Sequence, residues 1–150
     1  MKRTVFVLLS FLFIAACKNS DNNSSASQSP GVAQALKDSA NFTTIQWIDS
    51  MHRDLGKITS GEQLEVSFRF KNTGKKPLII VNVHASCGCT VPETPKEPFA
   101  PGAEGFIKAT FNSAGRIGTN RKEIYVNANT SPNTLQQLEF TVEVEKKAGG

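Results

Sequence analysis

An alternation of apolar and polar residues across positions 63–71 constrains the fold of this chain more than any other feature. Its apolar members are Leu64, Val66, Phe68 and Phe70. Successive side chains of a β-strand point to opposite faces, so this period of two predicts a strand that turns one face to a core and the other to water.

A second apolar run follows a cluster of turn residues. Residues 72–77 (NTGKKP) are typical of a turn, and residues 78–83 form a continuous run rich in β-branched side chains. Because this run does not alternate, it predicts a strand buried on both faces. We therefore predict that residues 63–71 and 78–83 form a hairpin.

Further strand-like segments complete the pattern. They are residues 105–111, 122–127 and 135–145, with residues 44–48 and 54–58 as shorter candidates. The longer segments alternate with period two and are bounded by Gly, Asn or Pro. About seven strands at this spacing, with no convincing long helix, predict an all-β fold. We expect an immunoglobulin-like β-sandwich over residues 42–147.

The N-terminus has the composition of an export signal. Lys2 and Arg3 precede an apolar run over residues 5–14, which is too short for a membrane-spanning helix of about 20 residues. The sequence Ile-Ala-Ala-Cys that ends at Cys17 resembles the lipobox of bacterial lipoproteins, in which the thiol receives a diacylglyceryl group. We expect a signal peptide over residues 1–16 and lipid attachment at Cys17.

A polar segment separates this cysteine from the predicted strands. Residues 18–41 contain no aromatic residue and are dominated by Ser, Asn, Asp, Ala and Gln, so they cannot bury enough surface to order themselves. We therefore expect residues 17–41 to form a lipidated, flexible tether with an r.m.s. span of roughly 25 to 30 Å. Residues 31–38 could form one or two helical turns.

Charge and motifs exclude several classes of function. The formal net charge is +4 and falls to +2 without Lys2 and Arg3, and the remaining lysines are scattered, so we expect no nucleic-acid partner. The sequence contains no GxSxG, HExxH or phosphate-loop motif, and we predict neither an enzyme nor a bound cofactor. Several glutamates alternate with core residues and are predicted to face solvent. They are Glu65, Glu139, Glu143 and Glu145.

Cys87 and Cys89, in the sequence SCGCT, are the only chemically distinctive residues of the predicted sandwich. Thiols of exported proteins tend to pair. In a straight strand, residues two apart have Cα atoms about 6.6 to 7 Å apart, at the long limit for a disulfide. Gly88 permits a tighter bend. The favoured interpretation is a structural pair, either closed as a disulfide or packed as small apolar side chains.

Two other interpretations of this pair stay open. Cys87 and Cys89 could form a redox site, since a strained disulfide that closes a short loop is more easily reduced than a relaxed structural one. With His84 they could instead bind copper(I) or zinc, although only three ligands are local. Elsewhere, Trp47 and Tyr125 could form a stacking platform, but a single tryptophan in a sandwich more often belongs to the core.

Several short motifs resemble one bacterial family. KNTG, PLII, SCGCT, APGAEG and AGRIG occur in that order between residues 53 and 130. In this order and spacing the chain resembles the family of domains of unknown function numbered fifteen seventy-three, common in lipoproteins of the Bacteroidetes type. The resemblance implies a sandwich similar to the ASPM, SPD-2 and Hydin type and to pilus chaperones. It implies no activity, because a fold does not determine a function.

These observations favour a membrane-anchored lipoprotein whose non-enzymatic sandwich binds another protein of the cell envelope. The alternative is a thiol-dependent envelope protein that handles copper or zinc, or exchanges disulfides, through Cys87 and Cys89. Lys18 follows Cys17 where the inner-membrane retention signal of some Gram-negative bacteria has Asp, which favours the outer membrane. The periplasmic or surface-exposed face stays open.

Overall fold

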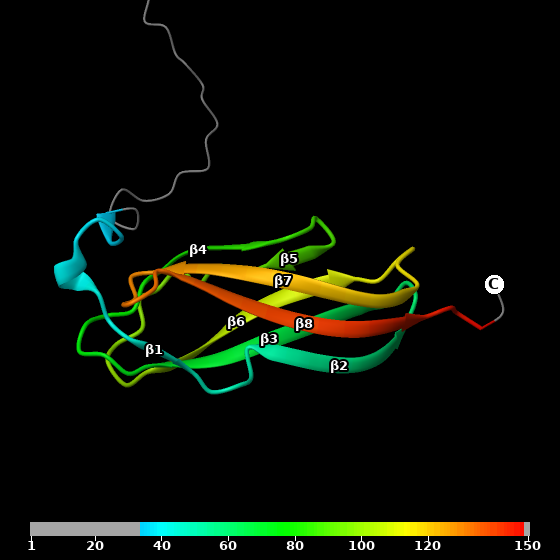
Figure 1. Ribbon diagram of the computed structural model, residues 1–150, viewed down its shortest axis with the longest axis horizontal. Helices are drawn as coiled ribbons and strands as arrows, with labels where there is room; N and C mark the ends of the chain where they lie inside the picture. Colours follow the sequence, from blue (N-terminus) through cyan, green and yellow to red (C-terminus); the bar gives the residue numbers. More distant parts are fainter. Residues whose placement is uncertain (1–33, 149–150) are drawn as a thin grey trace, which may run out of the picture.

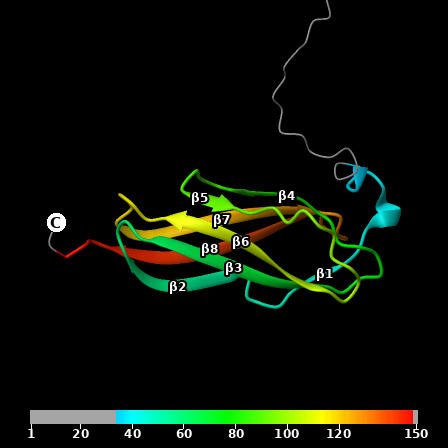
Figure 2. The same ribbon diagram turned by 180° about the vertical axis from the view of Figure 1, so that it is seen from behind.

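The computed structural model describes residues 34–148, which form two four-stranded β-sheets packed face to face (Figure 1, Figure 2). The strands are β1 (Ile45–Trp47), β2 (His52–Thr59), β3 (Gln63–Asn72), β4 (Ile80–Ala85), β5 (Thr90–Pro92), β6 (Glu104–Asn112), β7 (Gly118–Ala128) and β8 (Leu135–Glu145). The first sheet has the order β1-β3-β6-β5, and the second has the order β2-β8-β7-β4. The predicted all-β sandwich is confirmed, with eight strands because the short β5 was not predicted.

The core lies between the two sheets and is built from the alternating apolar residues. Its largest fully buried aromatic side chains are Phe68, Phe70, Phe111 and Phe140. Phe111 of the first sheet meets Phe140 of the second edge to face, with ring centroids 5.8 Å apart. Aromatic contacts of this geometry add to the free energy of apolar burial, so this pair helps to join the sheets.

The predicted hairpin is wrong, because β3 and β4 lie in different sheets. β3 pairs with β1 and β6, whereas β4 pairs with β7 alone. The predicted burial of residues 78–83 on both faces is also wrong. β4 is an edge strand, and Val81 and Asn82 are only half-buried. The turn residues therefore mark a crossing between sheets rather than a hairpin.

Two buried asparagines hold this crossing. The amide group of Asn72 donates to the carbonyl oxygens of Lys76 (2.8 Å) and Phe99 (2.9 Å). Asn129 accepts a hydrogen bond from the N–H of Ile79 (2.7 Å) and donates to the carbonyl oxygen of Pro77 (3.0 Å). These side chains pair backbone groups of the crossing that lie outside the strands.

The predicted signal peptide and Cys17 lie outside the described residues, as does most of the predicted tether. The described part of the tether, residues 34–41, contains a turn closed by the N–H of Lys37 on the carbonyl of Gln34 (3.0 Å), followed by the short 3-10 helix η1 (Ser39–Asn41). Within residues 34–148, no helix is long and apolar enough to cross a membrane.

Candidate functional site

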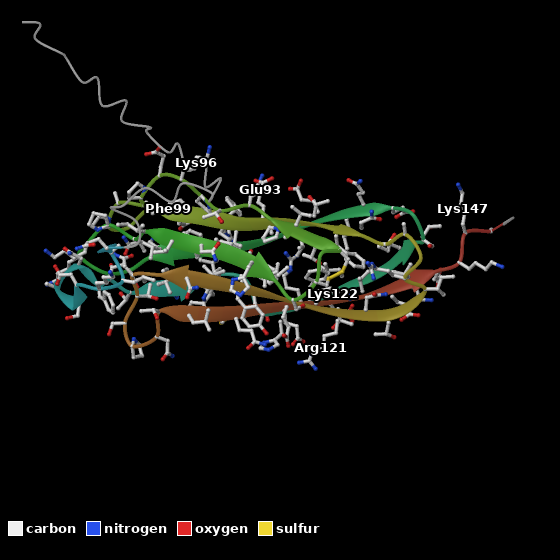
Figure 3. All side chains as sticks on the ribbon, turned by 90° about the horizontal axis from the view of Figure 1, so that it is seen from above. Glu93, Lys96, Phe99, Arg121, Lys122 and Lys147 are labelled. Carbon is white, nitrogen blue, oxygen red and sulfur yellow. A yellow bond between two sulfur atoms is a disulfide. The ribbon has the colours of Figure 1, made fainter. Side chains whose placement is uncertain are left out.

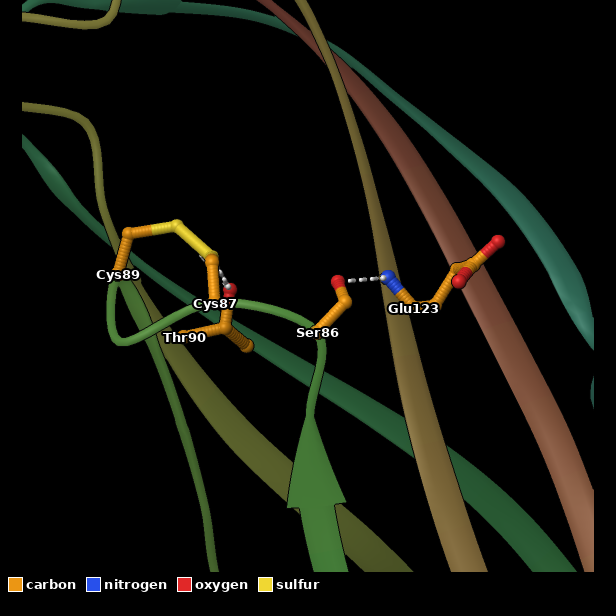
Figure 4. The surroundings of a disulfide bond; sticks show 5 residues. All are labelled: Ser86, Cys87, Cys89, Thr90 and Glu123. Carbon is orange, nitrogen blue, oxygen red and sulfur yellow. Dashed lines mark hydrogen bonds between the residues drawn. A yellow bond between two sulfur atoms is a disulfide. The ribbon is translucent and has the colours of Figure 1, made fainter.

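Cys87 and Cys89 form a disulfide in the turn between β4 and β5 (Figure 4). Their Cα atoms are 5.3 Å apart, closer than in a straight strand. The N–H of Thr90 donates to the carbonyl oxygen of Cys87 (3.3 Å), which closes the turn. The bend anticipated from the sequence therefore brings the two cysteines together.

The sequence predicts that Gly88, between the two cysteines, permits the bend. Its φ angle lies outside the left-handed region that favours glycine, and a Cβ atom built there would have no atom within 4 Å. The bend therefore does not depend on the conformational freedom of glycine.

The disulfide lies where the chain passes from the second sheet to the first. The N–H of Ser86 donates to the carbonyl oxygen of Glu123 in β7 (3.0 Å), and the hydroxyl of Ser86 accepts from the N–H of Glu123 (3.3 Å). Cys89 belongs to the core and is only 6% exposed, whereas Cys87 is half-buried. Thiol–disulfide exchange requires access to a sulfur, so an attacking thiolate would reach Cys87 first.

The structure does not bring together the three predicted metal ligands. The sulfurs of Cys87 and Cys89 are bonded to each other, so neither is a thiolate. His84 stacks instead on Tyr125, with ring centroids 5.1 Å apart and an interplanar angle of 20°. In the part of the chain that the structure describes, no group of three His, Cys, Asp or Glu side chains is placed to hold a metal ion.

The alternative of a stacking platform built from Trp47 and Tyr125 is wrong, because the two residues lie on different sheets. Trp47 belongs to β1 and packs edge to face on Phe70, with ring centroids 5.7 Å apart. Tyr125 belongs to β7 of the second sheet, where its hydroxyl donates to the carboxylate of Glu123 (2.5 Å). This hydrogen bond raises the pKa of Tyr125.

The prediction that Glu139 faces open solvent is wrong. Glu139 is only 8% exposed and forms an ion pair with Arg121 (2.5 Å). It points outward from β8, but β8 lies between β2 and β7, and His52 and Glu123 stand opposite it on these neighbours. Flanking side chains therefore bury a residue whose place in the alternation predicts exposure.

A groove beside β6 was missed by the sequence analysis. It has a volume of about 450 Å³, and we call it the β6 groove. Its lining includes Glu93, Pro95, Phe99, Glu104, Phe106 and Lys108. In Figure 3, Glu93 and Phe99 lie along one long side of the sandwich, away from Arg121.

One sequence signal for this groove was available. Ile107 and Phe111 are on the inward face of residues 105–111, so the alternation places Phe106 on the outward face. Phe106 is 49% exposed, and an apolar ring at a position where the pattern expects a polar residue marks a candidate contact surface.

Solved structures similar to this chain are sandwich domains. A protein of unknown function from Porphyromonas gingivalis W83 is 16% identical with a TM-score of 0.61, over 71% of this chain and 49% of that protein. This chain thus spans about half the length of that relative. The ASH/PapD-like domain 7 of human CEP192 is 12% identical with a TM-score of 0.52, over 73% of this chain and 89% of that domain.

The YadV chaperone is similar too, at 13% identity and a TM-score of 0.51, over 71% of this chain and 54% of the chaperone. At these identities the likeness shows the fold alone. No curated protein matches the sequence. The family described as "Protein of unknown function (DUF1573)" matches residues 45–144, which confirms the resemblance seen in the short motifs, and the chain belongs to this family.

Proposed function

We propose that this protein is a non-enzymatic interaction module of the cell envelope, anchored through a lipid on Cys17, whose sandwich binds another protein. The observation that carries the proposal is the β6 groove, with the half-exposed ring of Phe106 at its rim. Burial of apolar surface is the main favourable term in protein association, so this ring is a natural contact for a partner.

The surroundings of Phe106 support a protein partner. The outer faces of β3 and β6 carry loosely paired charges, Lys71 with Glu104 (3.8 Å) and Lys108 with Glu65 (3.9 Å). An apolar centre with a charged rim is the usual anatomy of a protein interface. One structurally similar protein, YadV, is itself a chaperone, a class that acts on other proteins.

The anchor is proposed from residues 1–17. The order of basic residues, apolar run, small residues and cysteine supports export and lipid attachment. A flexible tether after Cys17 would hold the sandwich clear of the lipid headgroups. Lys18 favours the outer membrane as the site of the anchor.

Two measurements test this proposal. Chemical crosslinking in the native envelope, followed by capture of the full chain, should recover one envelope protein with the wild type and much less of it with Phe106→Ser. Leu135→Ser is the matched control, because Leu135 is 50% exposed on the other sheet. Equal recovery of every envelope protein by all three forms, or turnover of a substrate by the purified chain, would contradict the proposal.

Cys17→Ser tests the anchor separately. The variant should leave the membrane fraction and lose its acyl chains in mass spectrometry, while residues 34–148 keep their β-sheet spectrum in circular dichroism. Retention in the membrane, with no acyl chain on the wild type, would show that the lipid anchor is wrong without affecting the binding proposal.

A second candidate function is disulfide exchange at Cys87 and Cys89. It is favoured by the short loop that the disulfide closes, since a cross-link this short stabilises a fold by only about 1.6 kcal/mol in the chain-entropy account. The half-buried Cys87 offers the accessible sulfur. A pair that stays oxidised in glutathione without denaturant would remove this candidate.

A further inference from the structure

The first sheet leaves half of an edge without a neighbouring strand. β5 pairs with only one end of β6, from Thr90 opposite Phe111 to Pro92 opposite Ala109, and the N–H of Glu93 adds a last bond to the carbonyl of Lys108 (2.9 Å). The chain then turns away from β6. The other half of β6 therefore has β3 on one side and no strand on the other.

Contacts with the second sheet cause this divergence. The hydroxyl of Thr94 accepts a hydrogen bond from the N–H of Val83 in β4 (3.1 Å). Phe99 then exchanges two backbone hydrogen bonds with Leu78 (2.9 and 2.8 Å). The segment between Glu93 and Phe99 is thus held toward β4, and the β6 groove opens between this segment and β6.

The backbone of Phe106 points into this gap. Along an antiparallel strand, the N–H and C=O of alternate residues point to the same side. The N–H of Asn112 donates to the carbonyl oxygen of Cys89 (2.9 Å), and the carbonyl oxygen of Lys108 accepts from the N–H of Glu93. The backbone groups of Asn112 and Lys108 therefore face the β5 side, and those of Phe106 must face it too. Within residues 34–148, neither the N–H nor the C=O of Phe106 has a hydrogen-bond partner. Such unpaired edge groups are a template for another strand.

Aromatic side chains and a proline line the groove next to these groups. Gly105 has no side chain, and the ring of Phe99 packs against its backbone, so that a Cβ atom on residue 105 would lie 2.4 Å from Phe99 Cε1. Phe99 and Pro95 therefore provide apolar surface beside the edge, and the ring of Phe106 adds more on the outer face. An added strand would place alternate side chains against this surface.

The charges at the groove favour a basic partner. Glu104 and Lys108 each have an ion-pair partner on β3, and they offset each other. Glu93 lines the same groove and has no ion pair among residues 34–148. The groove thus has one uncompensated carboxylate, which a Lys or Arg side chain would complement.

We propose that the open half of β6 binds an extended segment of another polypeptide, which adds to the first sheet as a strand beside Phe106. The segment carries an apolar side chain that contacts Phe99 and Pro95 and a basic side chain near Glu93. This inference locates the partner binding proposed above and rests on it.

A second copy of this chain does not fit the same edge in the register centred on Phe106. Antiparallel pairing about Phe106 would place Glu104 of one copy opposite Lys108 of the other, with complementary charges. That position opposite Lys108 is already held by Glu93, whose N–H bonds to the Lys108 carbonyl. A single extended peptide that ends before Lys108 avoids this clash and is therefore the favoured occupant.

Hydrogen exchange tests the open edge directly. In the full chain, the amide of Phe106 should exchange fast, whereas the amide of Ile107, which faces β3, should be strongly protected. Slow exchange of both amides in the monomer would mean that the edge is already covered, and would overturn the proposal.

A phage-displayed library of random short peptides, panned on the immobilised full chain, tests the occupant. We expect enriched peptides with an apolar residue and a basic residue on alternate positions, which slow exchange at Phe106 when bound. A single N-methyl group on the peptide amide that bonds to Phe106 should weaken binding about tenfold, as should Phe106→Pro, which removes the N–H. Leu135→Ala should bind as the wild type does.

The outcomes separate this inference from the proposed function. Strand addition is wrong, while the interaction module stands, if the captured envelope partner and the peptides bind Phe106→Pro as well as they bind the wild type and if N-methylated peptides bind the wild type undiminished. If the chain dimerises and loses the dimer in Phe106→Pro, a second copy is the occupant and the peptide proposal is wrong. If no peptide is enriched and no partner is captured, both proposals fail.

Discussion

The ring of Phe99 occupies the space that any side chain on residue 105 would need. A Cβ atom there would lie 2.4 Å from Phe99 Cε1 and 2.7 Å from Phe70 Cζ. Phe99 and Phe70 themselves pack edge to face, with ring centroids 4.9 Å apart. Gly105 therefore allows β6 to approach an aromatic pair that links the groove to the core.

Gly105→Ala should lower the free energy of unfolding by about 1 to 3 kcal/mol, since the buried ring of Phe70 and the half-buried ring of Phe99 must move to admit one methyl group. Urea unfolding followed by circular dichroism measures the change. Gly88→Ala is the matched control, because a Cβ atom there meets nothing within 4 Å, and we expect a change within about 0.5 kcal/mol. Equal effects of the two substitutions would show that the Gly105 contact is not as described.

Asn129→Ala should destabilise the fold by at least about 2 kcal/mol. It leaves the N–H of Ile79 and the carbonyl oxygens of Pro77 and Asn41 without this partner where the chain crosses between sheets, and each hydrogen bond lost at these part-buried groups costs about 1 kcal/mol. Asn127→Ala, in β7 just before Asn129, removes a half-buried side chain that makes no side-chain hydrogen bond within residues 34–148 and should cost less. Similar unfolding curves for both variants would contradict this role of Asn129.

Tyr125 provides a test of the contact with Glu123, because it is the only tyrosine of the chain and its ionisation can be followed by ultraviolet absorbance. The hydrogen bond to Glu123 raises its pKa above 10.0, and Glu123→Gln should lower that pKa toward this value. Because the folded-state pKa is the higher one, the hydrogen bond contributes stability below about pH 10, which is lost as the pH rises through the folded-state pKa. Glu143→Gln should leave the titration unchanged, since Glu143 bonds to Thr119 instead.

Replacing both Cys87 and Cys89 by Ser should lower the free energy of unfolding by about 1.6 kcal/mol from the lost cross-link, plus the cost of a hydroxyl at the buried position 89. The variant should still fold, because the turn keeps the hydrogen bond from Thr90 to Cys87 and the pairing of Ser86 with Glu123. Amide exchange of β4 and β5 measures this. Loss of the whole fold would show that the disulfide contributes more than its short loop predicts.

Three strands show which strand bounds the sequence pattern can predict. The alternation predicts residues 135–145 as a strand, and β8 has these same bounds. β7 is longer than predicted, because residues 118–121 carry no apolar alternation and are drawn into the sheet by pairing with β8. β5 has only three residues, too few for a periodic signal.

By itself the sequence determined the fold class, the face that each long strand turns to the core, and the family. Tertiary structure alone decided that β3 and β4 enter different sheets, that neighbours bury Glu139, and that β5 leaves half of β6 open. The physical reason is that a period of two records which side of a strand is apolar, but not which strand lies beside it. Pairing depends on contacts between residues far apart in the chain, such as Asn129 with Ile79 and Thr94 with Val83.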